Sequence, residues 1–234
     1  MTDEAADPNW SVGRRLAAEF VVIVVGVLMA LAVDAARDAR SDRLREATYL
    51  RQLQADLSVT ADDLAEAISV DRHARDGADR AITALNASPL PPSDSLAIWL
   101  AAATNSSAAF YPTMGTVTAL VESGELRLIR DEDIRRTVLR YHSAVESALR
   151  IVDGVDPHMW RTLERLGGMV SWPALLQPDD AHRFTVDWAL LASDRAFHSA
   201  LYDLRLVASN RLFALSTLRE SLDALLASLE GRPR

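Results

Sequence analysis

The strongest constraint on this chain is a run of 18 residues from Leu16 to Val33 in which Glu19 carries the only charge. As a helix rising about 1.5 Å per residue, the run spans roughly 27 Å, close to the ~30 Å hydrocarbon core of a bilayer. We therefore predict a single-pass transmembrane helix over residues 16–33. An N-terminal flank at 1–15 precedes it, and a helical bundle domain at 34–230 follows it.

A secretion signal has similar features, and both interpretations stay open. Arg14 and Arg15 are a basic region, and Ala30-Leu31-Ala32 resembles a cleavage site. An uncleaved anchor is favoured because the pattern after Val33 continues as a helix without turn residues. The side of the membrane is undetermined: five arginines after the run favour a cytoplasmic C-terminal domain, whereas the basic pair beside it favours the opposite orientation.

Three residues within the run invite a functional interpretation. Glu19 lies four residues after Arg15, so an ion pair directed toward the headgroups explains it better than a role in chemistry. Gly26 and Ala30 are a small-residue pair that would let two anchors pack closely. The predicted partners are the lipid bilayer through residues 16–33, a second copy through Gly26 and Ala30, and an unidentified protein.

Composition excludes several classes of function. The net charge of −8 argues against general nucleic-acid binding. All 25 basic residues are arginine, which together with abundant alanine is typical of GC-rich bacterial coding. The absence of cysteine excludes disulfides, thiol catalysis and cysteine-ligated metal sites.

The rest of the chain predicts an all-α fold, in which the transmembrane helix continues into a bundle of about three long helices with short connecting helices. Apolar residues recur at three- and four-residue spacing, and no segment alternates as a strand would. The proline-rich segment 86–94 is the clearest break. Short helices are expected at 95–103, 113–123 and 186–192.

Several residues are expected to begin or end these helices. Thr113, Asp131 and Ser193 are predicted N-caps, and Gly124 is predicted to adopt the left-handed conformation. In the segment 153–157 (DGVDP), Asp156 is predicted to cap a restarted or kinked helix, with Pro157 in its first turn. Gly167-Gly168 is predicted to end that helix.

No catalytic, cofactor-binding or metal-binding residue is predicted. The five histidines are scattered, and no phosphate-binding loop, dinucleotide fingerprint or nucleophile elbow is present. Asp153, Asp156 and His158 are explained as helix-end residues without a metal. Tyr141 and His142 either line a pocket or belong to the core, where the tyrosine hydroxyl would be hydrogen-bonded; we favour the core. The tryptophans near connecting segments are expected to pin short helices onto long ones: Trp99, Trp160, Trp172 and Trp188.

Three stretches resemble one family of uncharacterised bacterial single-pass inner-membrane proteins with a helical domain of unknown function. They are RRLAAEFVVIVVGVLMALAVDAARD from residue 14, YLRQLQADL from residue 49, and ALVESGELRLIRDEDIRRTVLRYHS from residue 119. This chain departs from the family pattern at Asp34 and Ala35, and at His142, where the family has a tyrosine. The resemblance implies an inner-membrane, mostly helical protein and transfers no catalytic residue.

These features are compatible with three functions. The leading hypothesis is a membrane-anchored, non-enzymatic helical protein that acts through protein contacts, as a scaffold or accessory subunit. The alternative is a ligand-binding sensory domain that passes its signal to a partner protein. An enzyme is the least favoured, because no catalytic constellation is visible.

Overall fold

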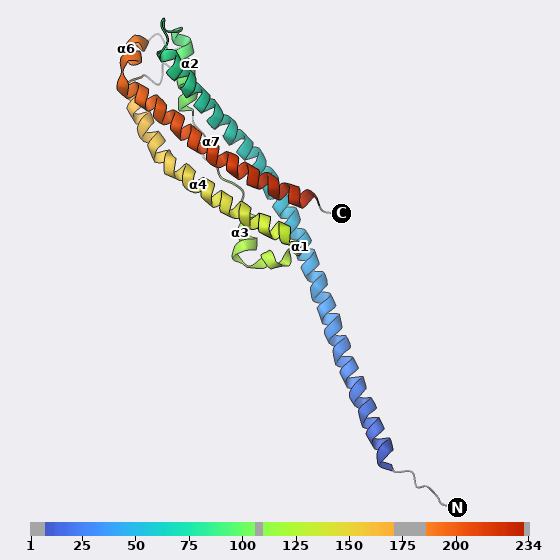
Figure 1. Cartoon of the computed structure of the whole chain (residues 1–234). Coiled ribbons are helices and arrows are strands. Elements are labelled where there is room, and N and C mark those ends of the chain that lie inside the picture. Colours follow the sequence, from blue (N-terminus) through green and yellow to red (C-terminus); the bar gives the residue numbers. More distant parts are fainter. Residues whose placement is uncertain (1–7, 106–109, 171–185, 232–234) are drawn as a thin grey trace, which may run out of the picture. The chain divides into compact units, whose positions relative to one another are not determined.

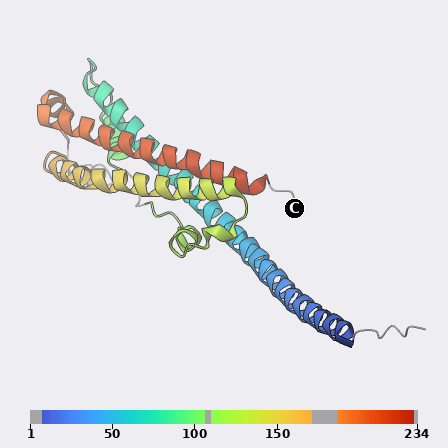
Figure 2. The same ribbon diagram turned by 60° about the horizontal axis from the view of Figure 1, so that its bottom comes forward.

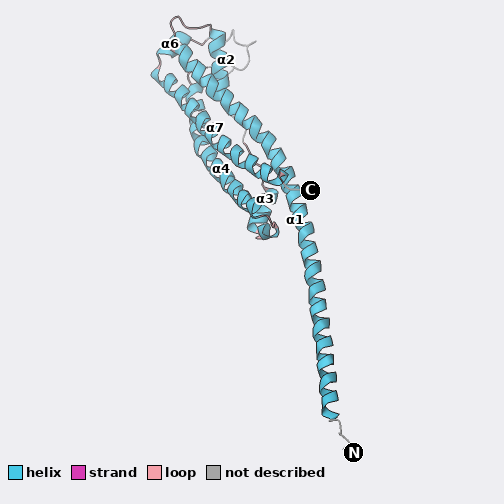
Figure 3. Cartoon of the chain, turned by 45° about the vertical axis from the view of Figure 1, so that its right-hand side comes forward, coloured by secondary structure: helices cyan, strands magenta, loops and turns pink. Residues whose placement is uncertain are grey.

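The computed structural model describes residues 8–105, 110–170 and 186–231, with side chains from residue 19 onward. Figure 3 shows helices and loops over these ranges, with no strand. The predicted all-α class is therefore confirmed. The helices are α1 (Pro8–Leu85), α2 (Ser93–Thr104), α3 (Gly115–Glu122), the 3-10 helix η1 (Glu125–Leu128), α4 (Glu132–Gly167), α6 (Trp188–Ser193) and α7 (Arg195–Glu230).

The chain divides into two compact units, residues 1–50 and 51–234. Helix α1 belongs to both, because its helical hydrogen bonding continues through residues 50 and 51. In the first unit, the apolar run is not covered by other parts of the chain: Phe20, Val22 and Val33 are 68%, 70% and 67% exposed. By length and composition α1 can cross a membrane, with a mean hydropathy of 2.3 over its most apolar 18-residue window.

The second unit is built on three long helices. Residues 51–85 of α1 lie beside α4 and α7, and α7 runs antiparallel to α4 (Figures 1 and 2). Each helix buries an apolar stripe at helical spacing, because none of these amphipathic helices is stable without a partner for its apolar face. Fully buried members include Leu53, Leu57 and Leu64 of α1, Ile134, Val138 and Tyr141 of α4, and Leu215, Leu218 and Leu222 of α7.

The short helices α2 and α6 pack at one end of the bundle. Leu96 and Leu100 of α2 and Trp188 of α6 join one apolar cluster with the end of α1 and the start of α7. Helix α2 approaches α1 closely at Gly77, where an added Cβ would lie 2.7 Å from the Ala102 Cβ and 2.8 Å from the Ala103 nitrogen. A glycine at this point of α1 thus permits the contact.

The predictions for Asp131 and Gly124 are confirmed, whereas the prediction for Ser193 is wrong. Asp131 caps α4 by accepting hydrogen bonds from the backbone nitrogens of Asp133 and Ile134, and Gly124 has a left-handed φ of 72°. Ser193, however, is the last residue of α6. Asp194 caps α7 instead, because a carboxylate also satisfies the exposed N–H groups of the first turn.

Helix α3 has no side-chain cap of its own, so the prediction for Thr113 is wrong. Met114 occupies the N-cap position. Asp56 of α1 supplies the missing acceptor: its Oδ2 lies 3.2 Å from the Thr116 nitrogen and 2.7 Å from the Thr116 hydroxyl. Thr113 donates its backbone N–H to Thr60 of α1 at 3.1 Å. A tertiary contact thus replaces the local cap.

Helix α4 does not restart at the DGVDP segment. It runs unbroken from Glu132 to Gly167 with Pro157 inside it, and it ends at the predicted glycine pair. Pro157 has no N–H to donate to the carbonyl four residues earlier, so this turn has one helical hydrogen bond fewer than its neighbours. Asp156 is not a cap: its side chain points to another helix.

Candidate functional site

The most unusual group of side chains in the described residues is a buried arginine between two carboxylates. Arg211 of α7 is 1% exposed, and Asp71 of α1 is completely buried. The Arg211 Nε lies 3.2 Å from each carboxylate oxygen of Asp71. Its Nη1 lies 2.6 Å from Oδ1 of Asp156, on α4. Three helices therefore each contribute one charged side chain to this cluster, which we call the Arg211 cluster.

The two carboxylates have different environments. The Asp156 side chain is 36% exposed, whereas that of Asp71 has no exposed surface. Burial raises the pKa of Asp71 above its ordinary value, an effect that outweighs the opposing attraction of Arg211, and the negative charge of Asp156 adds to the rise. The attraction of Arg211 therefore does not fully offset the cost of burying the Asp71 carboxylate.

The cluster lies at the turn of α4 that contains Pro157. Asp156 directly precedes Pro157, and the nearby Gly154 and Asp153 are exposed. A turn without a full set of helical hydrogen bonds is more easily deformed than its neighbours. The contact between Arg211 and Asp156 thus joins this turn of α4 to α7.

The acidic and histidine residues near this turn do not converge on one point. Asp156 binds Arg211, whereas His158 faces Asp203 of α7, with its Nε2 3.6 Å from a carboxylate oxygen. Asp203 also accepts from Arg165 at 2.8 Å. The described residues contain no group of three or more His, Cys, Asp or Glu side chains able to hold a metal ion. Asp156 and His158 therefore each contact α7.

Tyr141 lies in the core, as the favoured interpretation predicted. It is completely buried, and its hydroxyl, beside Thr60, makes no hydrogen bond of normal geometry. Burial raises its pKa to about 12, and the charge of Asp56 contributes to the rise. The neighbouring His142 is half-buried on the same helix, with its Nδ1 3.9 Å from Glu146. The prediction that the hydroxyl would be hydrogen-bonded is not met.

The tryptophans divide into two kinds. Trp188 is buried in the end cluster, and Trp99 packs against it, as predicted. Trp160 instead lies within α4 and is 65% exposed, so the prediction that it pins a short helix is wrong. Trp172 lies outside the described residues.

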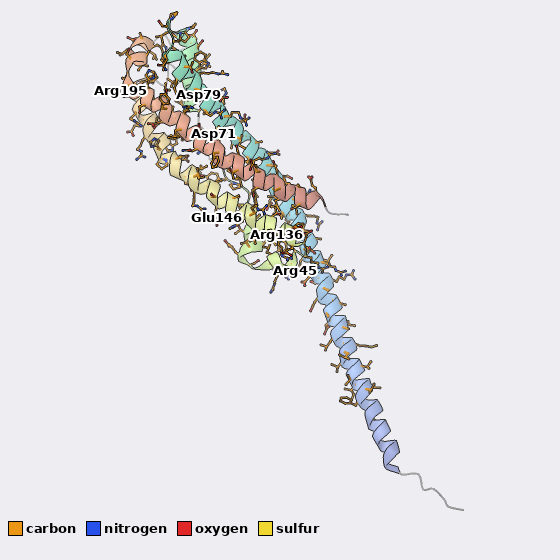
Figure 4. All side chains as sticks on the ribbon, viewed as in Figure 1. Arg45, Asp71, Asp79, Arg136, Glu146 and Arg195 are labelled. Carbon is orange, nitrogen blue, oxygen red and sulfur yellow. The ribbon has the colours of Figure 1, made fainter. Side chains whose placement is uncertain are left out.

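A shallow apolar hollow lies beside the end cluster. It has a volume of about 450 Å³ and is lined by residues of α1, the proline-rich segment and α2: Asp79, Arg80, Thr83, Ala84, Ala87, Pro89, Pro91 and Trp99. Asp79 at its rim is paired with Arg205 of α7 at 2.6 Å. Figure 4 shows Asp71 and Asp79 along the part of α1 that lies beside α7.

Sequence reasoning missed the Arg211 cluster because its members are 55 to 140 residues apart. One signal was present. Arg211 lies among the apolar positions of α7, between Ala208 and Leu212, and a charged residue on a buried stripe needs a partner of opposite charge. The identity of that partner depended on how the helices pack.

Comparison with known proteins adds no relationship: no family model, no curated protein and no solved structure matches this chain.

Proposed function

We propose that this protein is a membrane-anchored, non-enzymatic helical module that acts through protein contacts, as a scaffold or accessory subunit in a bacterial inner membrane. The observation that carries the proposal is the exposed apolar run within α1. Burying large aliphatic and aromatic side chains contributes about 1.5–3 kcal/mol each, so leaving this run in water is strongly unfavourable. A bilayer covers it on every side. The resemblance to single-pass inner-membrane proteins supports the same assignment.

Helix α1 also supports a role in transmitting contacts. It carries the apolar run and then supplies one of the three long helices of the second unit. In this proposal, the Arg211 cluster makes those three helices respond together. Displacing any one of them would leave a buried charge without its partner, which is costly in an apolar interior.

The anchor is tested by extracting membranes with alkaline carbonate. We expect the full chain to stay with the lipid pellet, and release into the supernatant would contradict the proposal. Reporter domains fused before Met1 and after Arg234 then determine the orientation.

The contact role is tested by placing a photo-crosslinking residue at single exposed positions in the full chain, in membranes. Trp160 and Leu139 of α4 and Ile98 of α2 are suitable, because all are exposed and apolar. We expect at least one position to give a discrete adduct that disappears when that face is changed to alanine. Absence of an adduct at every exposed apolar position would contradict a contact role.

The apolar hollow beside Trp99 supports a second candidate function, a ligand-binding sensory domain. Its volume suits a small apolar molecule, and the Asp79–Arg205 pair offers polar groups at the rim. A metabolite screen by thermal shift tests this, because a ligand of the folded state raises the melting temperature. A shift that persists in Trp99→Ala would place the ligand elsewhere.

A further inference from the structure

The outward face of α7 carries a regular stripe without acidic or basic side chains. Its residues are separated alternately by three and four positions, which is the spacing of a coiled-coil seam. Three are large and apolar: Tyr202, Leu206 and Phe213 are 49%, 56% and 70% exposed. The others are serines, which leave room for a neighbouring helix. We call the set the α7 stripe: Ser199, Tyr202, Leu206, Ser209, Phe213 and Ser216.

The neighbouring surface has a different character. The exposed side of α4 is rich in charges, among them Arg136, Arg140, Glu146 and Arg150. On α7, the same three-and-four series meets a charged residue at each end of the stripe, Arg195 four positions before Ser199 and Glu220 four positions after Ser216. The absence of charge over six successive positions is therefore confined to the α7 stripe and is not shared by the exposed side of α4.

A hollow on this face has the outline of a coiled-coil hole. It measures about 370 Å³ and is lined by Tyr202, Asp203, Arg205, Leu206 and Ser209. Four of these residues stand at positions i, i+3, i+4 and i+7, the diamond that receives a side chain from a facing helix in knobs-into-holes packing. Both charged residues of the hollow are already paired within the bundle, Arg205 with Asp79 and Asp203 with Arg165.

We infer that the α7 stripe binds the α7 stripe of a second copy of this chain, with the two helices parallel and in register. In this arrangement, Leu206 of each copy packs into the hole that residues 202, 205, 206 and 209 of the other copy form. The reason is that, in a parallel pair in register, a seam residue lies opposite the same position of the facing helix. Each seam residue then meets its own counterpart. A charged residue would face its identical charge, which explains why a self-pairing seam lacks charges, whereas a different partner would permit complementary ones.

The stripe is short, and this bears on where pairing occurs. A face of about five turns offers less area than the roughly 1,600 Å² that stable complexes bury, so free copies would associate weakly. Confinement in one membrane raises the effective concentration of the second copy. The inference thus deepens the proposed function by naming a partner, and the strength of the pairing depends on the proposed anchor.

Cysteine crosslinking of the full chain in native membranes tests the arrangement, because the chain has no cysteine of its own. Under mild oxidation, Leu206→Cys and Phe213→Cys should each give a disulfide-linked dimer as the main product. Val59→Cys on α1 and Leu139→Cys on α4 are matched controls, being 53% and 48% exposed apolar positions off the stripe, and should remain monomeric. Equal crosslinking at stripe and control positions would overturn the inference.

Charge substitution at Leu206 supplies a second test that does not depend on disulfide geometry. Leu206→Arg in the Phe213→Cys background should reduce crosslinking at least tenfold, and so should Leu206→Glu. Coexpression of the two variants should restore it, because opposite charges then face each other. Crosslinking unaffected by either charge would overturn the inference. Since Leu206 is exposed, both variants should keep the helical content of the parent.

Two further outcomes separate this inference from the other predictions. Efficient crosslinking between coexpressed Tyr202→Cys and Phe213→Cys chains, without crosslinking of Leu206→Cys, would overturn the parallel register in favour of an antiparallel pair. Gly26→Leu should leave the Leu206→Cys dimer in place if α7 is the interface, whereas loss of the dimer would assign pairing to the anchor. Carbonate extraction is read separately, so failure of pairing leaves the membrane anchor unaffected.

Discussion

The Nη1 of Arg211 lies 2.6 Å from Oδ1 of Asp156, one residue before the proline inside α4, while the Nε of the same guanidinium faces Asp71 on α1. One buried cation thus joins the three long helices of the bundle, and it contacts α4 where helical hydrogen bonding is incomplete.

Removing the guanidinium should be strongly destabilising. Arg211→Met leaves the carboxylate of Asp71 buried without its partner and should lower the free energy of unfolding by about 3–5 kcal/mol. The double variant Asp71→Leu/Arg211→Met removes both charges and should recover much of that loss. Urea unfolding of the full chain in detergent micelles, followed by circular dichroism, measures both. A double variant less stable than Arg211→Met would contradict this account.

The raised pKa of Asp71 predicts a particular pH dependence. Between its ordinary value of 3.8 and the higher value in the folded chain, the folded state binds a proton that the unfolded state does not. The contribution of Asp71 to stability is therefore greatest at low pH and is lost as the pH rises through the folded-state pKa. Wild type should gain stability relative to Asp71→Asn as the pH falls from 7 toward 4. If the stability of wild type relative to Asp71→Asn instead falls over this range, the folded-state pKa of Asp71 is lowered and not raised.

The close approach of α1 and α2 predicts opposite effects for two glycine substitutions. Gly77→Ala places a Cβ within 2.8 Å of the backbone of α2, which cannot move without disturbing the end cluster, and should cost about 1–3 kcal/mol. Gly154→Ala is the matched control, since nothing lies within 4 Å of the new Cβ and alanine favours the helix. Melting temperatures should fall for the first variant and stay level or rise for the second.

The contact between Asp56 and α3 predicts a capping effect across 60 residues of sequence. Asp56→Ala removes the acceptor for the Thr116 nitrogen and hydroxyl and should cost about 1–2 kcal/mol. Asp62→Ala, at an exposed position of the same helix, should change stability by less than about 0.5 kcal/mol. Hydrogen exchange of the α3 amides should rise in the first variant alone. Equal protection in both would show that α3 does not depend on this cap.

The apolar run predicts sensitivity to charge at its centre. Val25→Arg should disfavour insertion by about 2.5–3.5 kcal/mol, whereas Val25→Leu should insert as the parent does. The fraction of chain retained in membranes after carbonate washing reports the difference. Equal retention of the two variants would indicate that this stretch does not lie in the bilayer.

The long helices were predictable from sequence because their signals are local. Apolar spacing identified the stripes of α1, α4 and α7, and the carboxylate of Asp131 and the glycine at 124 acted on backbone within a few residues. Ser193 failed as a cap because the adjacent Asp194 supplies the same kind of acceptor. Thr113 failed because the acceptor for α3 comes from α1, which no pattern near residue 113 encodes.

What the sequence by itself determined is the class of fold, the three amphipathic stripes and an apolar run suited to a bilayer, since each follows from periodicity and hydrophobicity over neighbouring residues. Only the tertiary structure decided that Asp156 faces Arg211 instead of capping a helix, that Asp71 is the second carboxylate, and that Leu206 remains outside the bundle. These outcomes depend on which helix faces which. The packing of whole helices sets that choice through contacts between residues far apart in the chain.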